Sequence, residues 1–404
     1  QEFLTGNYEA SIKILEDSVL RYSQNHLHKA YYFGELARFH IVMGKCNKGQ
    51  KFVEKEEAYV NKIHKENTER KFSYASLYFN KSQLYQKKVW CTENSPYTSR
   101  TLKDDAQAKE IVEILNKWKL LFTNYSTLKE KREFCRACSN LGNVYAAQCQ
   151  YDEAIKVYKE GLEASKEDIF DIFMELSIDI GDLYQHIPYG YRGAIKHYEE
   201  AEFFARFLKV PHAVATCLMN KGFCRYRLLL ESREFEKHFN IAALADKLNA
   251  ERGYSTSNVA DSERRTIEEE KQAKILIEEE FREAIRVFSE IEWNLKDIEN
   301  QVFYFNVHDL AYTLFENFLY AENRTKEALE IAQLRRARVL RAFIEKKYSL
   351  IPSQDKVLTV EEIKNLAKQF NTTFILYSLA SCQLKAPGPN IRIWVISSKD
   401  VATI

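Results

Sequence analysis

Apolar and small residues in the middle of the chain recur with the three- and four-residue spacing of an α-helix. The segment CSNLGNVYAAQCQYDEAIKVYKEGLEASKE carries two such stripes, formed by Leu141, Gly142 and Tyr145 and by Ala154, Ile155, Tyr158, Gly161 and Leu162. Each stripe gives a helix one apolar face, and the residues between the stripes leave room for a tight turn. The pattern predicts a hairpin of two helices.

The second helix of this hairpin follows a pattern that recurs along the chain. An aromatic residue is followed three positions on by a small residue and then by Ile, and an apolar residue follows three positions later. The pattern occurs at residues 8–15, 151–158, 191–198 and 281–288, with a weaker copy at 328–332. We expect the small residue to lie where two helices touch. Gly142 and Gly181 should allow the paired helices to approach closely.

The order Leu-Gly-x-x-Tyr followed by Ala-x-x-x-Tyr resembles the tetratricopeptide repeat. The interval is 12 residues from Gly142 to Ala154 and 13 residues from Gly181 to Ala194. Lys166 stands where the repeat consensus has proline, and the two glycines are 39 residues apart, against about 34 in the regular repeat. The resemblance implies a mostly α fold, an irregular tetratricopeptide-like α-solenoid of helical hairpins.

In tetratricopeptide arrays the first helices of the hairpins line a concave groove that binds a peptide or a partner helix. Alignment with the two clear units implies that five polar residues face this groove: Arg136, Ser139, Asn143, Asp182 and Gln185. The amide of Asn143 offers a donor and an acceptor to a peptide backbone. The alternative is that these residues are only solvated polar side chains.

Three further helix pairs are expected, at residues 30–43 with 50–63, 74–89 with 105–122, and 213–230 with 234–249. The segment GYSTSNVADS, residues 253–262, is the longest stretch without a helical pattern. Its composition favours a hinge or a loop.

The pattern changes after the last long helix, which begins at Thr325. Pro352 interrupts the helical pattern, and Thr359 with Glu362 three residues later predicts a short capped helix. Two β-forming runs, Phe374–Leu379 and Ile391–Ile396, then predict an antiparallel pair of strands. In the second run Arg392, Trp394 and Ile396 should share one face. Two strands alone are marginal in water, so they must pair with further strands or lie against the helices.

This C-terminal order resembles the entry to a CHAT domain, a caspase-like family that often follows tetratricopeptide arrays. The matching features are Ala-Leu-Glu at 328–330, Arg-Ala-Arg at 336–338, Tyr377, and Trp-Val-Ile at 394–396. The resemblance implies an array over residues 1–348 and an incomplete CHAT-like α/β domain over 349–404. The family's catalytic His and Cys lie on later strand ends. Cys382 comes too early and the last histidine is His308, so no catalytic residue is assigned.

Composition supports a mostly helical protein, because Gly and Pro, which disfavour helix interiors, number only 12 and 6 among 404 residues. The net charge of +1 provides no overall field toward nucleic acid or anionic membranes. There is no apolar run of membrane-spanning length and no basic-then-apolar leader. The eight cysteines show no disulfide framework. We therefore expect buried, reduced thiols in a cytoplasmic protein.

The sequence gives only weak support for any metal-binding site. Cys135 and Cys138 form a C-x-x-C, but no second cysteine pair follows at zinc spacing, so core packing is favoured. His26 and His28 flank a residue in an expected inter-helix turn, and the other histidine pair, His186 and His197, lies near another turn. The first pair has no nearby carboxylate cluster, and a ligand role is not favoured for the second pair. We expect no metal and no cofactor.

Arg335, Arg338 and Arg341 recur every three residues on the last long helix. Such a stripe could bind phosphate or nucleic acid. The reading favoured here is that it packs against the CHAT-like domain that follows, since arginines pair readily with acidic neighbours.

Three functions remain open. The favoured one is an interaction scaffold that recognises a protein or peptide and regulates an attached caspase-like protease. The second is part of an active CHAT cysteine protease, which requires a His and a Cys beyond Ile404 in the gene. The third is a nucleic-acid-binding array, whose binding would depend steeply on salt and on the arginine stripe.

Overall fold

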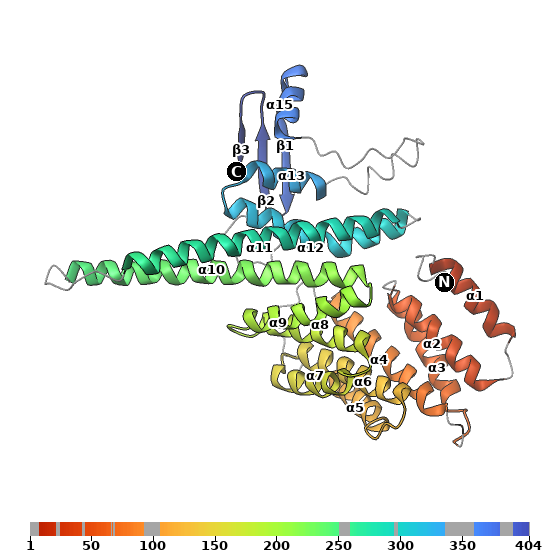
Figure 1. Cartoon of the computed structure of the whole chain (residues 1–404). Coiled ribbons are helices and arrows are strands. Elements are labelled where there is room, and N and C mark those ends of the chain that lie inside the picture. The colour runs from red at the N-terminus through yellow and green to blue at the C-terminus, as the bar shows by residue number, and fades with distance from the viewer. Residues whose placement is uncertain are drawn as a thin grey trace. The chain divides into compact units, whose positions relative to one another are not determined.

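The computed structural model of the chain (Figure 1) describes residues 8–21, 25–42, 45–65, 67, 69–92, 106–249, 259–294, 298–335, 359–379 and 391–403. The chain divides into two compact units, Gln1–Leu208 and Lys209–Ile404. We refer to them as unit 1 and unit 2 and describe each by itself. None of the described helices combines the length and the apolarity that crossing a lipid bilayer requires.

Unit 1 is a succession of helices, which are α1 (Tyr8–Arg21), α2 (His26–Val42), α3 (Cys46–Val60), α4 (Arg70–Thr92), α5 (Ala106–Leu121), α6 (Leu128–Ala147), α7 (Tyr151–Ser165), α8 (Phe170–His186) and α9 (Tyr191–Phe207). The closest packing joins α2 to α3, α6 to α7 and α8 to α9. The first helices of successive hairpins also touch, since α4 contacts α6 and α6 contacts α8. The predicted stack of helical hairpins is therefore confirmed.

Each clear hairpin is closed by a glycine facing a tyrosine. A Cβ added to Gly142 would overlap the ring of Tyr158, and one added to Gly181 would lie 2.6 Å from Cε1 of Tyr198. Both tyrosines and the small residues Ala154 and Ala194 are buried. The small residues therefore lie at helix contacts, as the repeat pattern predicts.

The core of unit 1 runs continuously from α4 to α8 and includes Trp118, Leu141, Tyr158 and Leu176. The N-terminus of α6 is fixed by a capping box, in which Thr127 accepts from the Glu130 backbone amide while the Glu130 side chain accepts from the Thr127 amide. This arrangement satisfies amide groups that the first turn of a helix leaves unpaired.

Cys135 and Cys138 belong to this core and are fully buried. Burial raises the pKa of both thiols to about 12. They stay protonated at neutral pH, and the thiolate is the form that binds metals. The packing role expected of this C-x-x-C is confirmed. Of the other cysteines with described side chains, Cys217 and Cys224 are also buried and Cys149 is exposed.

Unit 2 contains α10 (Pro211–Asn249), α11 (Val259–Asn294), α12 (Ile298–Ala321), α13 (Thr325–Arg335) and α15 (Val360–Gln369), with strands β1 (Phe374–Leu379), β2 (Ile391–Ile396) and β3 (Val401–Thr403). The long helices α10 and α11 form one hairpin, and α12 packs against α11 and α13.

The prediction of a helix pair at 213–230 and 234–249 is wrong, because α10 is one helix of 39 residues whose hairpin partner is α11. The intervening residues Glu231, Ser232 and Arg233 include no Gly or Pro to end the helix. The expected loop at 253–262 lies outside the described residues up to 258, and α11 already includes residues 259–262.

The C-terminal sheet has the order β1-β2-β3 and is antiparallel throughout. Phe374 pairs with Ile396 and Tyr377 with Ile393, so the two predicted strands are confirmed and β3 adds a third. The predicted cap of α15 is also present, as a capping box of Thr359 and Glu362.

One face of this sheet packs on helices. The buried side chains of Trp394 and Ile396 lie in a small core with Leu329 of α13 and with Val360 and Ile363 of α15. On the other face Ile375 and Tyr377 are exposed by 62% and 65%. The sheet therefore lies against helices, which was one of the two outcomes expected for a pair of strands.

A buried ion cluster also joins the sheet to the helices of unit 2. Glu316 of α12 is 1% exposed and accepts from Nη1 of Arg392 on β2 at 3.1 Å. Nη1 of Arg335 on α13 lies 3.9 Å from the other Glu316 oxygen, and the Arg392 guanidinium lies 4.4 Å from the Tyr320 ring centroid. Three elements thus share one buried carboxylate.

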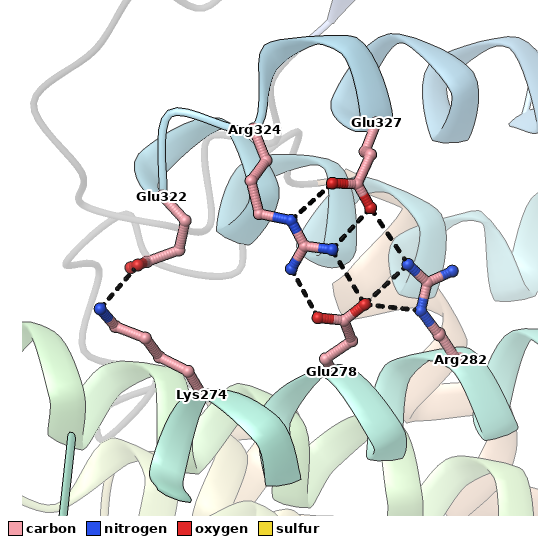
Figure 2. A network of polar contacts seen from close by, with 6 residues as sticks. All are labelled: Lys274, Glu278, Arg282, Glu322, Arg324 and Glu327. Carbon is pink, nitrogen blue, oxygen red and sulfur yellow. Dashed lines mark hydrogen bonds and ion pairs between the residues drawn. The ribbon is translucent and has the colours of Figure 1, made fainter. Parts of the chain in front are cut away.

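A second charge network holds the α12–α13 turn on α11 (Figure 2). Arg324 in this turn donates from Nη1 and Nη2 to Glu278 of α11 and also bonds Glu327. Lys274 of α11 pairs with Glu322 at 2.9 Å. The hydrogen bond from Arg324 lowers the pKa of Glu278 to about 2; burial opposes this shift, and the bond from Arg282 supports it. The network therefore keeps its charges throughout the neutral range.

The expected domain boundary between residues 348 and 349 lies outside the described residues, as do Arg338 and Arg341. Arg335 lies within the described residues and pairs with an acidic residue of this chain: its Nε donates to Asp309 Oδ1 at 2.6 Å. It also shares Glu316 with β2.

We predict that Gly142→Ala destabilises unit 1 by about 1–3 kcal/mol, because the Tyr158 ring has no space for an added methyl group. Urea unfolding followed by circular dichroism measures the change. Gly193→Ala is the comparison variant, since its Cβ would lie 3.2 Å from the Tyr184 ring, a contact that a shift of a few tenths of an ångström relieves. It should destabilise unit 1 less than Gly142→Ala does, because alanine also favours a helix. Equal stability of Gly142→Ala and the wild type would contradict the proposed closure of the hairpin.

We predict that Glu316→Gln loosens the sheet, because two arginines would then face a neutral amide; breaking a buried pair costs about 3 kcal/mol or more. Hydrogen exchange of peptides covering Ile391–Ile396 should accelerate. Glu290→Gln removes an exposed partner of Arg286 and should change exchange little. Unchanged exchange in Glu316→Gln would show that the cluster does not hold the sheet.

Candidate functional site

The five polar residues that the sequence assigns to a groove lie on two neighbouring helices. Arg136, Ser139 and Asn143 are on α6, and Asp182 and Gln185 are on α8. These are the first helices of consecutive hairpins, and they pack against each other. The sequence alignment did not select Asp179 of α8, which the structure places among these side chains.

Hydrogen bonds connect the members of this set. Ser139 Oγ donates to Asp179 Oδ2 at 2.8 Å. The Tyr158 hydroxyl donates to Asn143 Oδ1 at 2.5 Å, and the Tyr198 hydroxyl donates to Asp182 Oδ1 at 2.5 Å. Gln185 Nε2 donates to the Tyr198 hydroxyl. We call the set Ser139, Asn143, Asp179, Asp182 and Gln185 the α6–α8 polar face.

The same arrangement occurs in both hairpins. A tyrosine of the second helix passes over a glycine of the first, and the residue after that glycine accepts its hydroxyl hydrogen. Asn143 follows Gly142, and Asp182 follows Gly181. Because Tyr158 and Tyr198 are buried, their rings fix the positions of these two polar side chains. The repeated tyrosine was visible in the sequence as a packing residue, but its polar role was not.

Arg136 lies apart from these bonds. Its Nη1 is 3.0 Å from Glu133 Oε1, one turn away on α6, and half of its side chain is exposed. Its charge acts on Glu175 of α8. Burial and the charge of Asp171 raise the pKa of Glu175, whereas the charges of Arg136 and Arg132 lower it. The structure thus connects four of the five predicted residues and leaves Arg136 at the margin.

The two carboxyl groups of the α6–α8 polar face have pKa values above the ordinary value of an aspartate. Burial raises the pKa of Asp179 to about 8; Asp182 and Glu175 raise it further, whereas the hydrogen bonds from Ser139 and Asn143 oppose this. Burial raises the pKa of Asp182 to about 6, against the bond from Tyr198. Asp182 nevertheless keeps contact with solvent. At neutral pH this face therefore carries less negative charge than its composition implies.

The polar contacts continue from α6 to α4. Asn140 Oδ1 accepts from Ser82 Oγ at 3.2 Å and from Gln83 Nε2 at 3.1 Å.

The hairpin of α2 and α3 differs, because a Cβ on Gly34 would lie 2.6 Å from Oε1 of buried Glu56. A carboxyl group here faces the glycine, where the later hairpins have a tyrosine ring. Burial raises the pKa of Glu56 to about 7, although Asn80 and Ser76 donate to it.

The histidines noted in the sequence lie at separate places. His26 begins α2, so His26 and His28 occupy its first turn and not the expected inter-helix loop. The ring of His197 stacks on Tyr184, with centroids 5.7 Å apart. Within the described part of the chain, no group of three or more His, Cys, Asp or Glu side chains is arranged to hold a metal ion.

Comparison with known proteins gives only distant likenesses. No protein-family model matches the chain, and no curated protein matches its sequence.

Three solved structures illustrate the likenesses. BtubC (BKLC) from P. vanneervenii is 14% identical over 63% of this chain and 94% of its own, with a TM-score of 0.40. The apo form of RapI is 14% identical over 72% and 95%, with a TM-score of 0.42. The STAND protein PH0952 from Pyrococcus horikoshii, described as having a tetratricopeptide-repeat sensor, is 16% identical over 79% and 42%, with a TM-score of 0.45.

The chain's own helices and their contacts define the fold. It is a mostly α protein, an irregular tetratricopeptide-like array of helical hairpins with a small three-stranded antiparallel sheet near the C-terminus.

We predict that Asp179→Asn becomes increasingly stabilising, relative to the wild type, as pH rises from about 4 to about 8. The folded state holds the Asp179 proton up to about pH 8, whereas an unfolded aspartate loses it near 3.9. Raising the pH through this window therefore favours unfolding of the wild type. Urea unfolding at both ends of the window should show a difference of several kcal/mol, since each unit of pKa shift corresponds to about 1.4 kcal/mol.

Asp171→Asn is the matched control with the opposite sign. Burial raises the pKa of Asp171, but the hydrogen bond and the charge of Arg132, together with backbone amides, outweigh burial, so the pKa falls below its ordinary value. Its carboxylate therefore contributes stability at every pH above about 4, and the variant should be less stable than the wild type at both pH 5 and pH 8. A pH-independent effect of Asp179→Asn would contradict the raised pKa.

Proposed function

We propose that this chain is a protein-interaction scaffold whose α6–α8 polar face binds a segment of a partner protein or a peptide. The observation that carries the proposal is the repeated contact of a buried tyrosine hydroxyl with the residue after a glycine, at Asn143 and again at Asp182. Packing of the hairpins orients these polar groups before any partner arrives, which reduces the entropy lost on binding.

The chemistry of this face suits a polypeptide ligand. Gln185 and Asn143 have amide donors, Ser139 has a hydroxyl, and the carboxyl groups of Asp179 and Asp182 have acceptors. Such a mixture matches the alternating N–H and C=O groups of a peptide backbone. In the proposed complex these residues line a concave groove, and Arg136 stands at its margin.

We further propose that the array regulates an attached caspase-like domain, of which residues 349–404 are the beginning and residues 1–348 the regulatory part. The confirmed pairing of β1 with β2 and the buried Trp394 support this, as does the exposed face with Ile375 and Tyr377, which further elements of a larger domain would cover. The shared carboxylate of Glu316 supplies a physical link from α12 and α13 to the sheet.

Proteolysis by the whole protein remains the alternative proposal. His308 is buried on α12 with its ring stacked on Phe288, at a centroid distance of 4.3 Å, and Cys382 lies outside the described residues.

The buried free thiols support a reducing compartment such as the cytoplasm.

The groove proposal is tested with peptides selected from a random display library on the full chain. We expect selected peptides to bind, and Asn143→Ala/Asp182→Ala to weaken their binding by about tenfold or more, since buried polar contacts at interfaces cost about 2 kcal/mol or more when truncated. Isothermal titration calorimetry measures the affinity, and circular dichroism checks that the variant is folded.

The matched control is Asp152→Ala/Glu153→Ala on the first turn of α7, where both residues are exposed. It should leave binding unchanged. Selection of no peptide, or an equal loss of affinity in the control, would contradict binding at the α6–α8 polar face.

A further inference from the structure

Helix α3 and the turn that follows it carry a second regular stripe on their surface. Lys48, Phe52, Lys55, Tyr59 and Lys62 follow one another at intervals of four, three, four and three residues. We call these five residues the lysine–aromatic stripe. The other stripe of α3, made by Gly49, Val53, Glu56 and Val60, is buried. The lysine–aromatic stripe is a separate surface, with its lysines exposed and its aromatic rings half-buried.

The rings of this stripe form a fixed row with α2. Phe33 of α2 stacks on Tyr59 with centroids 5.4 Å apart and on Phe52 at 6.3 Å. The ammonium groups of two lysines of the stripe, Lys55 and Lys62, and of Lys29 lie over these rings. Lys55 Nζ is 5.2 Å from the Phe52 centroid, Lys62 Nζ is 5.0 Å from that of Tyr59, and Lys29 Nζ of α2 is 4.9 Å from Tyr59. Cation–π contacts therefore hold the charges in place.

These positive charges have no carboxylate partners among the described residues. Lys48, Lys55 and Lys62 form no ion pair there, whereas lysines elsewhere in unit 1 do, such as Lys81 with Glu57 and Lys131 with Asp168. The acidic residues of α3 are engaged elsewhere: Glu57 pairs with Lys81, Glu54 accepts from Gln50, and Glu56 accepts from Ser76 and Asn80. The stripe is thus a local positive surface on a chain of nearly zero net charge.

A neighbouring histidine adds no charge to this surface. The ring of His40 on α2 stacks on Phe52 at 5.3 Å. Burial lowers the pKa of His40, and Lys48 and Lys45 lower it further. His40 is therefore neutral at pH 7, and the charge of the surface comes from the lysines.

We propose that the lysine–aromatic stripe docks an acidic amphipathic α-helix of a partner protein. Alternating intervals of four and three residues are the spacing by which one helix meets another along a seam. Lys48 and Lys55 are seven residues apart on α3, about 10 Å along its axis, and Lys62 lies seven residues further on, in the turn after Val60. A partner helix with acidic residues at the same period would face each lysine, and its aliphatic residues would lie on Phe52 and Tyr59.

The geometry favours this helix over other anionic partners. Single-stranded nucleic acid binds by stacking its bases on open aromatic faces. Here Phe33 and the lysines lie against the ring faces, which leaves only part of each ring exposed, enough for an aliphatic contact but not for a stacked base. Membrane surfaces bind helices that carry a broad apolar face, and this stripe alternates apolar residues with charges. This site is distinct from the α6–α8 polar face, so the two proposals fail or hold independently.

The test uses a synthetic helical peptide of about three heptads, with glutamate at every seventh position and leucine at the intervening seam positions. We expect it to bind the full chain in a fluorescence-anisotropy titration and to bind less at higher salt. Lys48→Glu/Lys55→Glu/Lys62→Glu should weaken binding about tenfold or more. The same peptide with lysine in place of glutamate should bind the reversed variant and not the wild type.

The control variant Lys109→Glu/Lys166→Glu/Lys196→Glu makes the same change of charge at exposed positions elsewhere in unit 1, and it should bind the glutamate peptide like the wild type. Equal weakening by the control would overturn the proposal, as would failure of the glutamate peptide to bind. Tighter binding of an oligo-thymidine strand or of phosphatidylserine vesicles, lost in the reversed variant, would also overturn it in favour of nucleic acid or membrane.

Discussion

The contact between a glycine on one helix and a tyrosine ring on the next determines most of unit 1. It sets how closely α6 approaches α7 and α8 approaches α9, because any side chain at Gly142 or Gly181 would collide with the ring. The same contact delivers the hydroxyl of the tyrosine to Asn143 or Asp182. Fold and candidate site therefore have one cause, and a substitution that relaxes the packing should also displace the polar groups.

Unit 2 is held together by charge as well as by apolar contact. Glu316 is buried between arginines of α13 and β2, and Arg324 bonds α11 from the α12–α13 turn. A buried ion pair adds little net stability compared with apolar packing, but breaking one partner is costly. Such pairs make the position of the sheet on its helices specific. The apolar contacts of Trp394 and Leu329 supply the buried apolar surface that stabilises the contact.

Local patterns predicted the elements that depend on local physics. The hairpins followed from small residues at helical spacing, the cap of α15 from Thr359 and Glu362, and both strands from β-forming runs. The length of α10 was missed, because a charged segment without Gly or Pro fits a continuous helix as well as two. Asp179 was missed because its surroundings come from α6, 36 to 40 residues earlier, and sequence spacing does not report such contacts.

The two edges of the C-terminal sheet differ in a way that matters for handling the protein. β3 has only three residues and follows Lys399 and Asp400, whereas β1 reads FILYSL, without charge or proline. Proteins usually protect long edge strands with such residues, because exposed N–H and C=O groups recruit strands from other molecules. Among the described residues β1 is the less protected edge, so self-association of concentrated protein should begin there, and a lysine in place of Ile375 should reduce it.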